Sequence, residues 1–179
     1  PLVSDNKKAL KRLDQIRYGF AEVMNEKIET MWANKLGLIS YDETLVDELQ
    51  RLMVLSKVDY TIFFRKLSNI PDQFTDLKES FYQPNSEQVD KQWENWLQRW
   101  RNTITRDNDI RVTSTKMKRI NPKYTWREWL IAPAYEKAEQ GDYSLIKELQ
   151  ALFNNPYDEQ SSKLEKKYYR LKPKEFFNA

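Results

Sequence analysis

Residues 10–37, with the sequence LKRLDQIRYGFAEVMNEKIETMWANKLG, contain the pattern that determines the fold class. Apolar side chains recur there at intervals of about three and four residues, at Leu10, Leu13, Ile16, Phe20, Val23, Met24, Met31 and Leu36. Because an α-helix turns once in ~3.6 residues, this spacing predicts a helix from about residue 5 to about residue 35. Gly19 is a point at which that helix could break, and Gly37 is the residue type that commonly ends helices.

Similar spacing continues along the chain and predicts further helices. Ser40 and Glu43 have the spacing of a capping box, which places the start of a second helix there. Asp59 and Ser86 are residue types that cap helix N-termini, and apolar residues follow each of them at helical intervals. We therefore expect three helices that end near Leu55, Leu67 and Ile104, with a short helix or an ordered loop at 74–81.

Two further helices are predicted in the last third of the chain. Asn121-Pro122 is the pattern of a cap followed by proline at the first helical position, so a helix is expected from there to about Gln140. Pro133 lies inside this helix and should kink or split it, because proline lacks the backbone N–H that the helix needs. The last predicted helix covers about residues 143–153.

No segment shows strand-like alternation of useful length, so the sequence predicts an all-α, irregular multi-helix domain of about six to eight helices. We expect residues 1–160 to form this helical domain, with a possible subdivision near 84–108. After the helix that ends near Ile104, we expect a turn at Asp107-Asn108-Asp109 and then a short basic segment to Ile120. Residues 161–179 are predicted to form a basic and aromatic C-terminal tail.

The residue types that the chain lacks exclude several classes of site. It has no His and no Cys, and its three glycines are Gly19, Gly37 and Gly141. Zinc sites use His and Cys, disulfides need Cys, and phosphate-binding loops need clustered glycines. We therefore expect no catalytic, cofactor-binding or metal-binding site that is complete within this chain. A carboxylate pair such as Glu22 and Glu26 stays an alternative, although solvated helix faces explain these residues more simply.

The sequence also gives little sign of a membrane or polyanion partner. No apolar run in it is longer than Trp129–Ala132, which has four residues, whereas a membrane-spanning helix needs roughly 20. The net charge of +3 provides only weak attraction to polyanions. We interpret the first residue, Pro1, as a sign that the chain is a processed or excised piece.

Trp93, Trp96 and Trp100 are spaced so that they share one helical face. Such a face could stack on single-stranded nucleic acid, but the same spacing is typical of a helix that faces the core. Basic stretches at 106–127 and 163–174 could contact phosphate or an acidic protein surface, although a solvated face or tail is the simpler interpretation. We favour core packing and do not expect nucleic acid as a partner.

The residues from Asp59 to Arg65 form a denser polar and aromatic cluster than a helix cap requires, and it includes Tyr60, Thr61 and Phe64. An unpaired buried charge is very costly, so a buried Arg65 would need partners. We interpret the cluster as a network that holds two helices together rather than as a catalytic site.

Several short motifs, in one consistent order from about residue 20 to 173, resemble the region that follows the kinase-like core in the selenoprotein O family. They are Lys35-Leu36-Gly37-Leu38, Leu52-Met53, Asp59-Tyr60-Thr61, Phe64-Arg65-Lys66-Leu67-Ser68, Trp93 and Trp96 with Arg99, Asn121-Pro122-Lys123, Arg127, Trp129-Leu130, Ala138-Glu139, Gly141-Asp142 and Asn155-Pro156-Tyr157. Together they are specific. The structural or interface candidates are Asp59, Tyr60, Thr61, Phe64, Arg65, Trp93, Trp96, Asn121, Arg127 and Trp129.

The resemblance implies a function for a parent protein rather than for this chain alone. Selenoprotein O enzymes have a pseudokinase fold and transfer AMP from ATP to protein hydroxyl groups with Mg²⁺, and their catalytic motifs lie in the kinase-like core. Because this sequence has no counterpart of those motifs, the resemblance implies a non-catalytic C-terminal helical domain that packs on the kinase-like core of the same parent chain. ATP, Mg²⁺ and protein substrates are then expected for the parent enzyme, which would be intracellular, cytoplasmic in a bacterium or mitochondrial in a eukaryote.

Two departures from the family accompany this resemblance. Pro133 stands where relatives usually have a helix-compatible residue, and residues 176–179 lack the terminal Cys or selenocysteine motif of many members. Two other functions stay open, namely a freestanding helical protein-interaction module and, with less support, a nucleic-acid-binding helical domain.

Overall fold

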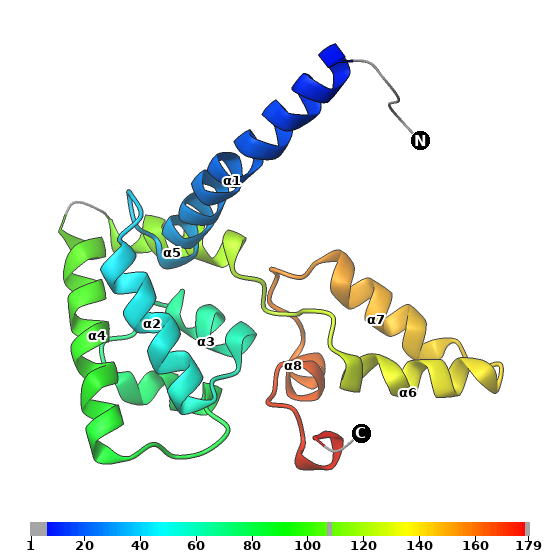
Figure 1. The fold of residues 1–179 in the computed structure, drawn as a ribbon. Helices are drawn as coiled ribbons and strands as arrows, with labels where there is room; N and C mark the ends of the chain where they lie inside the picture. The colour runs from blue at the N-terminus through cyan, green and yellow to red at the C-terminus, as the bar shows by residue number, and fades with distance from the viewer. Residues whose placement is uncertain (1–6, 107–108, 178–179) are drawn as a thin grey trace.

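The computed structural model describes residues 7–106 and 109–177, and these form an all-α fold (Figure 1). Its elements are α1 (Lys7–Leu36), α2 (Glu43–Ser56), α3 (Tyr60–Leu67), the 3₁₀ helix η1 (Phe74–Ser80), α4 (Glu87–Thr105), α5 (Ile110–Ile120), α6 (Glu128–Glu139), α7 (Ser144–Asn154), α8 (Ser162–Tyr168) and the 3₁₀ helix η2 (Lys174–Phe176). Within the described ranges, the only extended pairing is one isolated bridge between Val58 and Phe81. The predicted fold class is confirmed. The turn expected at Asp107-Asn108 lies outside the described residues.

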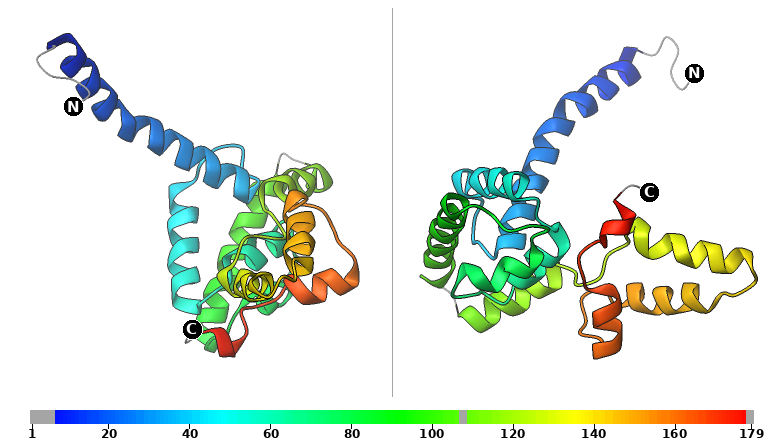
Figure 2. Two further views of the ribbon diagram at one scale, coloured as in Figure 1. Left: turned by 90° about the vertical axis from the view of Figure 1, so that its right-hand side faces the viewer. Right: turned by 90° about the horizontal axis from the view of Figure 1, so that it is seen from below.

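Helix α1 extends away from the rest of the molecule, as the views in Figures 1 and 2 agree. It is continuous through Gly19, so no break occurs there. Its buried side chains, Ala33, Lys35 and Leu36, all lie in its last turn. The helix is therefore anchored at its C-terminal end only.

Gly37 makes this anchor possible. Its φ angle of +68° is in the left-handed region, and a Cβ atom placed there would lie 2.7 Å from Thr113 Cγ2 and 2.8 Å from Met117 Sδ. A larger residue would therefore be strained and would collide with α5. The absence of a side chain allows α5 to pack closely against the end of α1.

The larger apolar cluster is formed by the end of α1 together with α2, α3, η1, α4 and α5. Trp93, Trp96 and Trp100 are fully buried in it, and each indole N–H has an acceptor. These acceptors are Ser56 Oγ at 2.8 Å, the Leu45 carbonyl at 2.9 Å and the Leu36 carbonyl at 2.8 Å. Helix α4 is thus the centre of this core.

A smaller apolar cluster is formed by α6, α7, α8 and the segments that flank them, with buried residues Tyr124, Trp129, Leu130, Ala134, Leu149, Leu152 and Tyr168. Helices α6 and α7 lie side by side in Figures 1 and 2. A subdivision was expected near 84–108, but α4, which covers most of the described part of that range, belongs to the larger cluster, and the division into domains stays a prediction. Tyr168 and Phe176, both from the predicted tail, pack with the smaller cluster.

The helix predicted to begin at Asn121-Pro122 begins instead at Glu128, so that prediction was wrong. Asn121 is the residue that ends α5, and its backbone N–H donates to the Met117 carbonyl at 2.8 Å as in the preceding helical turn. The N–H groups of Lys123 and Tyr124 both donate to the Pro156 carbonyl, which holds the following segment in a non-helical course. The basic stretch before Asn121, expected as a segment without assigned structure, is helix α5.

Two smaller details also differ from expectation. Asp42, not Ser40, caps α2, and its carboxylate accepts the Leu45 N–H at 2.9 Å. Of the two effects predicted for Pro133, splitting does not occur, because Pro133 lies within the continuous span of α6, and a kink stays a prediction.

Candidate functional site

Buried polar side chains gather where the two apolar clusters meet. The buried members are Lys35, Asp59, Arg65, Asn121 and Lys123, and they are joined by the partly buried Arg127 and the more exposed Glu159. We call these seven residues the polar junction. They come from the end of α1, the start and middle of α3, the segment between α5 and α6, and the segment before α8.

Asp59 is the first centre of the polar junction. One carboxylate oxygen, Oδ1, caps α3 by accepting the Ile62 N–H at 3.0 Å. The Arg127 guanidinium donates to both oxygens, at 2.7 and 2.9 Å, and the Tyr82 hydroxyl donates to Oδ2 at 3.0 Å. A planar guanidinium matches a carboxylate in this two-bond geometry. The pair therefore ties the start of α3 to the residue that precedes α6.

Arg65 is the second centre, and its side chain is almost completely buried. It donates to the carbonyls of Lys118 and Asn121 at 3.0 and 3.2 Å, and to the Tyr157 carbonyl at 2.9 Å. It also pairs with Glu159 Oε1 at 2.8 Å. Arg65 thus links α3 to the end of α5 and to the segment that follows α7, which is the partner set that a buried guanidinium requires.

Lys35 and Asn121 form the third part of the polar junction. The Lys35 ammonium donates to Asn121 Oδ1 at 2.9 Å and lies 4.3 Å from the centre of the Phe64 ring. The Asn121 side-chain amide donates to the Lys35 carbonyl at 2.9 Å and to Ser68 Oγ at 3.0 Å. Burial lowers the pKa of Lys35 to about 8, since desolvation disfavours the charged amine.

Lys123 and Glu159 complete the polar junction. The Lys123 ammonium donates to Glu159 and, at 2.8 Å, to Glu165 Oε1. Burial alone would lower the pKa of Lys123, but these two carboxylates outweigh it and raise the pKa above its usual value. Burial would likewise raise the pKa of Glu159, yet the hydrogen bonds from Lys123 and Arg65 hold it below its usual value.

Of the ten residues singled out from the sequence, nine lie in or beside the polar junction or in one of the two cores. Asp59, Arg65, Asn121 and Arg127 belong to the polar junction, and Thr61 lies beside it with its hydroxyl 3.2 Å from that of Thr125. Phe64, Trp93 and Trp96 are in the larger core, and Trp129 is in the smaller one. Tyr60 is about half exposed and places its ring 4.8 Å from the Lys35 ammonium.

Sequence reasoning did not select three members of the polar junction, Lys35, Lys123 and Glu159. Lys35 directly precedes Leu36-Gly37, where the sequence predicts the end of a helix, and a lysine in that last helical turn was a signal by which it could have been selected. Glu159 carried no such signal, because it stands in a polar stretch between two helices.

The polar junction has the chemistry of a structural network. Arg65, Lys123 and Arg127 bond to carbonyl and carboxylate acceptors from distant segments, whereas Lys35 bonds to the Asn121 amide oxygen, and no nucleophile with an adjacent base is present among the seven residues. Among the described residues, no group of three or more carboxylates could hold a metal ion. No helix among them is both long enough and apolar enough to cross a membrane.

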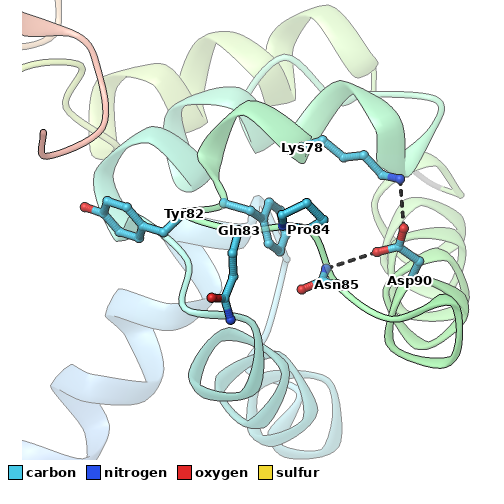
Figure 3. Close-up of a pocket in the computed structure, with 7 residues that line it drawn as sticks. Lys78, Tyr82, Gln83, Pro84, Asn85 and Asp90 are labelled. Atoms are coloured by element: carbon cyan, nitrogen blue, oxygen red, sulfur yellow. Dashed lines mark hydrogen bonds and ion pairs between the residues drawn. The ribbon is translucent and has the colours of Figure 1, made fainter. Parts of the chain in front are cut away.

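A shallow pocket of about 370 Å³ lies beside the loop after η1 (Figure 3). On one side, Asp90 accepts hydrogen bonds from the Lys78 ammonium at 2.8 Å and the Asn85 amide at 3.0 Å. Tyr82 points away from this pair, toward Asp59. The pocket's charged groups are therefore paired with one another, and they form no catalytic arrangement.

Comparison with known proteins assigns the family. The family described as "Protein adenylyltransferase SelO" matches residues 4–154, which is most of the chain. The chain belongs to the SelO family. Three curated relatives carry the name "Protein nucleotidyltransferase YdiU". The one from Flavobacterium johnsoniae is 33% identical over 83% of this chain and 31% of its own length. Those from Aromatoleum aromaticum and Photobacterium profundum are 34% and 36% identical, over 79% and 70% of this chain and 28% and 27% of their own lengths.

The SelO chain described here therefore spans about three tenths of the length of the curated relatives that it matches.

Proposed function

We propose that this SelO-family chain is the C-terminal helical domain of a protein adenylyltransferase, that it is non-catalytic alone, and that it packs on the kinase-like core of its parent. ATP and Mg²⁺ would then bind to the kinase-like core and not to this chain. The parent's protein substrates are its further partners, and it works inside the cell. The chain supplies a rigid helical support, which the polar junction holds in one shape.

The observation that carries this proposal is the apolar face of α1. Eight apolar side chains on this helix are between 38% and 62% exposed, namely Leu10, Leu13, Ile16, Phe20, Val23, Met24, Ile28 and Met31. At ~100° per residue they fall within an arc of about 140°, so they form one continuous stripe. We call it the α1 stripe. Large exposed apolar patches mark interaction sites, and the body of this chain covers only the last turn of the helix.

The first test concerns catalysis. The isolated chain is incubated with α-labelled ATP, Mg²⁺ and a model protein that offers Ser, Thr and Tyr hydroxyls. No transfer of label is expected, because the described residues contain no group of three or more carboxylates that could hold the metal ion. Transfer of AMP by the chain alone would refute the proposal.

The second test concerns packing. A hybrid polypeptide is made from the Flavobacterium johnsoniae relative: the segment that matches this chain is removed, and this chain is put in its place. Hydrogen exchange of the amides in residues 10–31 should be at least tenfold slower in the hybrid than in the isolated chain, because the α1 stripe is then covered.

A matched pair of variants makes this second test specific. Ile16→Glu with Phe20→Glu places two charges in the α1 stripe and should abolish the protection. Gln15→Glu with Asn25→Glu adds the same charge on the opposite face and should leave it unchanged. Equal exchange in the hybrid and the isolated chain would show that the α1 stripe does not contact the core.

A second candidate function, a helical interaction module that pairs with its own copy, is favoured by the charges along α1. The first turns carry Lys7, Lys8, Lys11 and Arg12, whereas Glu22, Glu26 and Glu29 lie further along. Antiparallel pairing of two α1 helices would bring opposite charges together. Sedimentation of the isolated chain decides this alternative: a dimer that Ile16→Glu with Phe20→Glu dissociates supports it, and a monomer at all concentrations rules it out.

A further inference from the structure

A broad groove of about 1180 Å³ lies between the α3–η1 region and the C-terminal segment from α8 to Phe177. One wall is fixed by the backbone contacts around the Val58–Phe81 bridge, which include the Tyr82 N–H to the Lys57 carbonyl at 3.4 Å. The other wall is attached through the Tyr169 hydroxyl, which donates to the Ile62 carbonyl at 3.4 Å. The groove is therefore a built feature of the fold, separate from the α1 stripe.

Positive charge dominates the groove. Its lining includes six cations, Lys57, Lys66, Lys166, Arg170, Lys172 and Lys174, against two carboxylates, Glu79 and Glu165. Both carboxylates are already paired, Glu79 with Lys66 at 2.6 Å and Glu165 with Lys123 at 2.8 Å. The remaining cations therefore leave the groove with an uncompensated positive potential, although the whole chain carries only +3.

Apolar groups lie between these cations. Ile62, Tyr169, Leu171 and Pro173 line the groove, and at its end Tyr82 packs edge-on against Phe177 at 5.4 Å between ring centres. The Tyr82 hydroxyl is held by Asp59 and the Tyr169 hydroxyl by Ile62. These rings are fixed by the fold, whereas nucleic-acid platforms use free aromatic faces on which bases stack.

Most of the cations are lysines, which pair with an anion as single point charges. Five are lysines, and the one arginine, Arg170, already donates to the Lys167 carbonyl at 3.0 Å and covers the Trp129 ring. No free guanidinium fork, the group that binds carboxylate or phosphate through two parallel hydrogen bonds, lines the groove. Alternating apolar and lysine side chains match an extended peptide whose residues alternate between apolar and acidic.

We propose that this groove, between α3–η1 and the α8–Phe177 segment, binds an extended acidic segment of a partner protein. The segment's carboxylates pair with Lys57, Lys166, Lys172 and Lys174, and its apolar side chains contact Ile62, Leu171 and Pro173. This proposal does not depend on the packing of the α1 stripe or on adenylyl transfer.

The test uses the full 179-residue chain and a fluorescein-labelled 12-residue peptide of alternating Glu and Leu, followed by fluorescence anisotropy at low salt. Binding is expected, and it should weaken at least tenfold when Gln replaces each Glu. Lys166→Glu with Lys174→Glu should also weaken binding at least tenfold. Lys147→Glu with Lys163→Glu changes the net charge equally, at exposed lysines outside the groove, and should weaken it less than twofold.

Several results would overturn the proposal. They are no binding of the acidic peptide at low salt, equal losses in the two double variants, or tighter binding of a 12-nucleotide oligo(dT) that the Lys166→Glu, Lys174→Glu pair abolishes. If that pair fails to fold, the hydrogen-exchange footprint of the peptide on the unmodified chain decides instead. Protection must fall on residues 57–66 and 166–177, and protection confined to other segments contradicts the assignment.

Discussion

Asp59 shows how one side chain can serve two purposes in this fold. It caps α3 through Oδ1 and neutralises Arg127 through both oxygens. The capping role requires only an oxygen acceptor, whereas the pairing role requires a negative charge. The two roles can therefore be separated by a single substitution.

Asp59→Asn keeps the capping oxygen and removes the charge, so it should leave Arg127 buried without its counter-ion. We expect the free energy of unfolding to fall by about 3–5 kcal/mol. Denaturant unfolding at pH 7 measures this, with Arg127→Met and the double variant closing a cycle. The double variant should lose less than the sum of the singles. Lys91→Ala, which breaks the exposed pair with Glu87, is the control and should cost less than ~0.5 kcal/mol. Additive losses in the cycle would show that Asp59 and Arg127 are not coupled.

Lys35 gives the second prediction at this scale, which concerns pH. Because burial lowers its folded-state pKa to about 8 from 10.5, the unfolded chain holds the Lys35 proton between these values while the folded chain does not. Raising the pH through that window therefore favours folding. Relative to Lys35→Met, the unmodified protein should gain about 2 kcal/mol of stability between pH 7 and pH 9.5, and little below pH 7. Unfolding curves at both pH values measure the difference, and a pH-independent difference would mean that Lys35 titrates normally.

At the scale of elements, periodicity predicted the helices well and their contacts poorly. The spacing in 10–37 predicted α1 correctly, but the same spacing did not reveal that most of its apolar face is exposed. Asn121 fits a cap at either end of a helix. It ends α5, where its amide donates to the Lys35 carbonyl and to Ser68 Oγ, both far away in the sequence. Local pattern specified element type, whereas the polar junction arises from long-range pairing that no local pattern contains.

Pro133 provides the prediction that belongs to an element. It stands inside α6, where it cannot donate the backbone hydrogen bond that the position would otherwise make. Pro133→Ala restores that donor and should raise the free energy of unfolding by about 1–3 kcal/mol. Thermal and denaturant unfolding measure the gain, with Ala134→Gly as a control that should destabilise the same helix. A loss of stability in Pro133→Ala would indicate that the proline ring is needed for packing.

At the scale of the whole molecule, two apolar cores of unequal size are joined by polar contacts. Helices α6 and α7 pack mainly on each other, and the larger core contacts them chiefly through the polar junction. Because hydrogen bonds between charged groups are directional, such a network restricts the relative position of the two cores more than apolar contact does. Its cost is the desolvation of the charged side chains. The α1 stripe extends from the larger core, whereas the groove lies between α3–η1 and the α8–Phe177 segment.

This arrangement predicts that the smaller core depends on Arg65 for its attachment. Arg65→Met removes four bonds at once, to the carbonyls of Lys118, Asn121 and Tyr157 and to Glu159. We expect amides in α6 and α7 to exchange at least tenfold faster, while those in α2 and α4 keep their protection because the tryptophan core is untouched. Hydrogen exchange read by mass spectrometry resolves the two groups of helices. The control Arg99→Met removes an exposed arginine from α4 and should leave both groups unchanged. If all helices lose protection together in Arg65→Met, the two cores form one cooperative unit and the polar junction is an internal part of it, not a joint between separable halves.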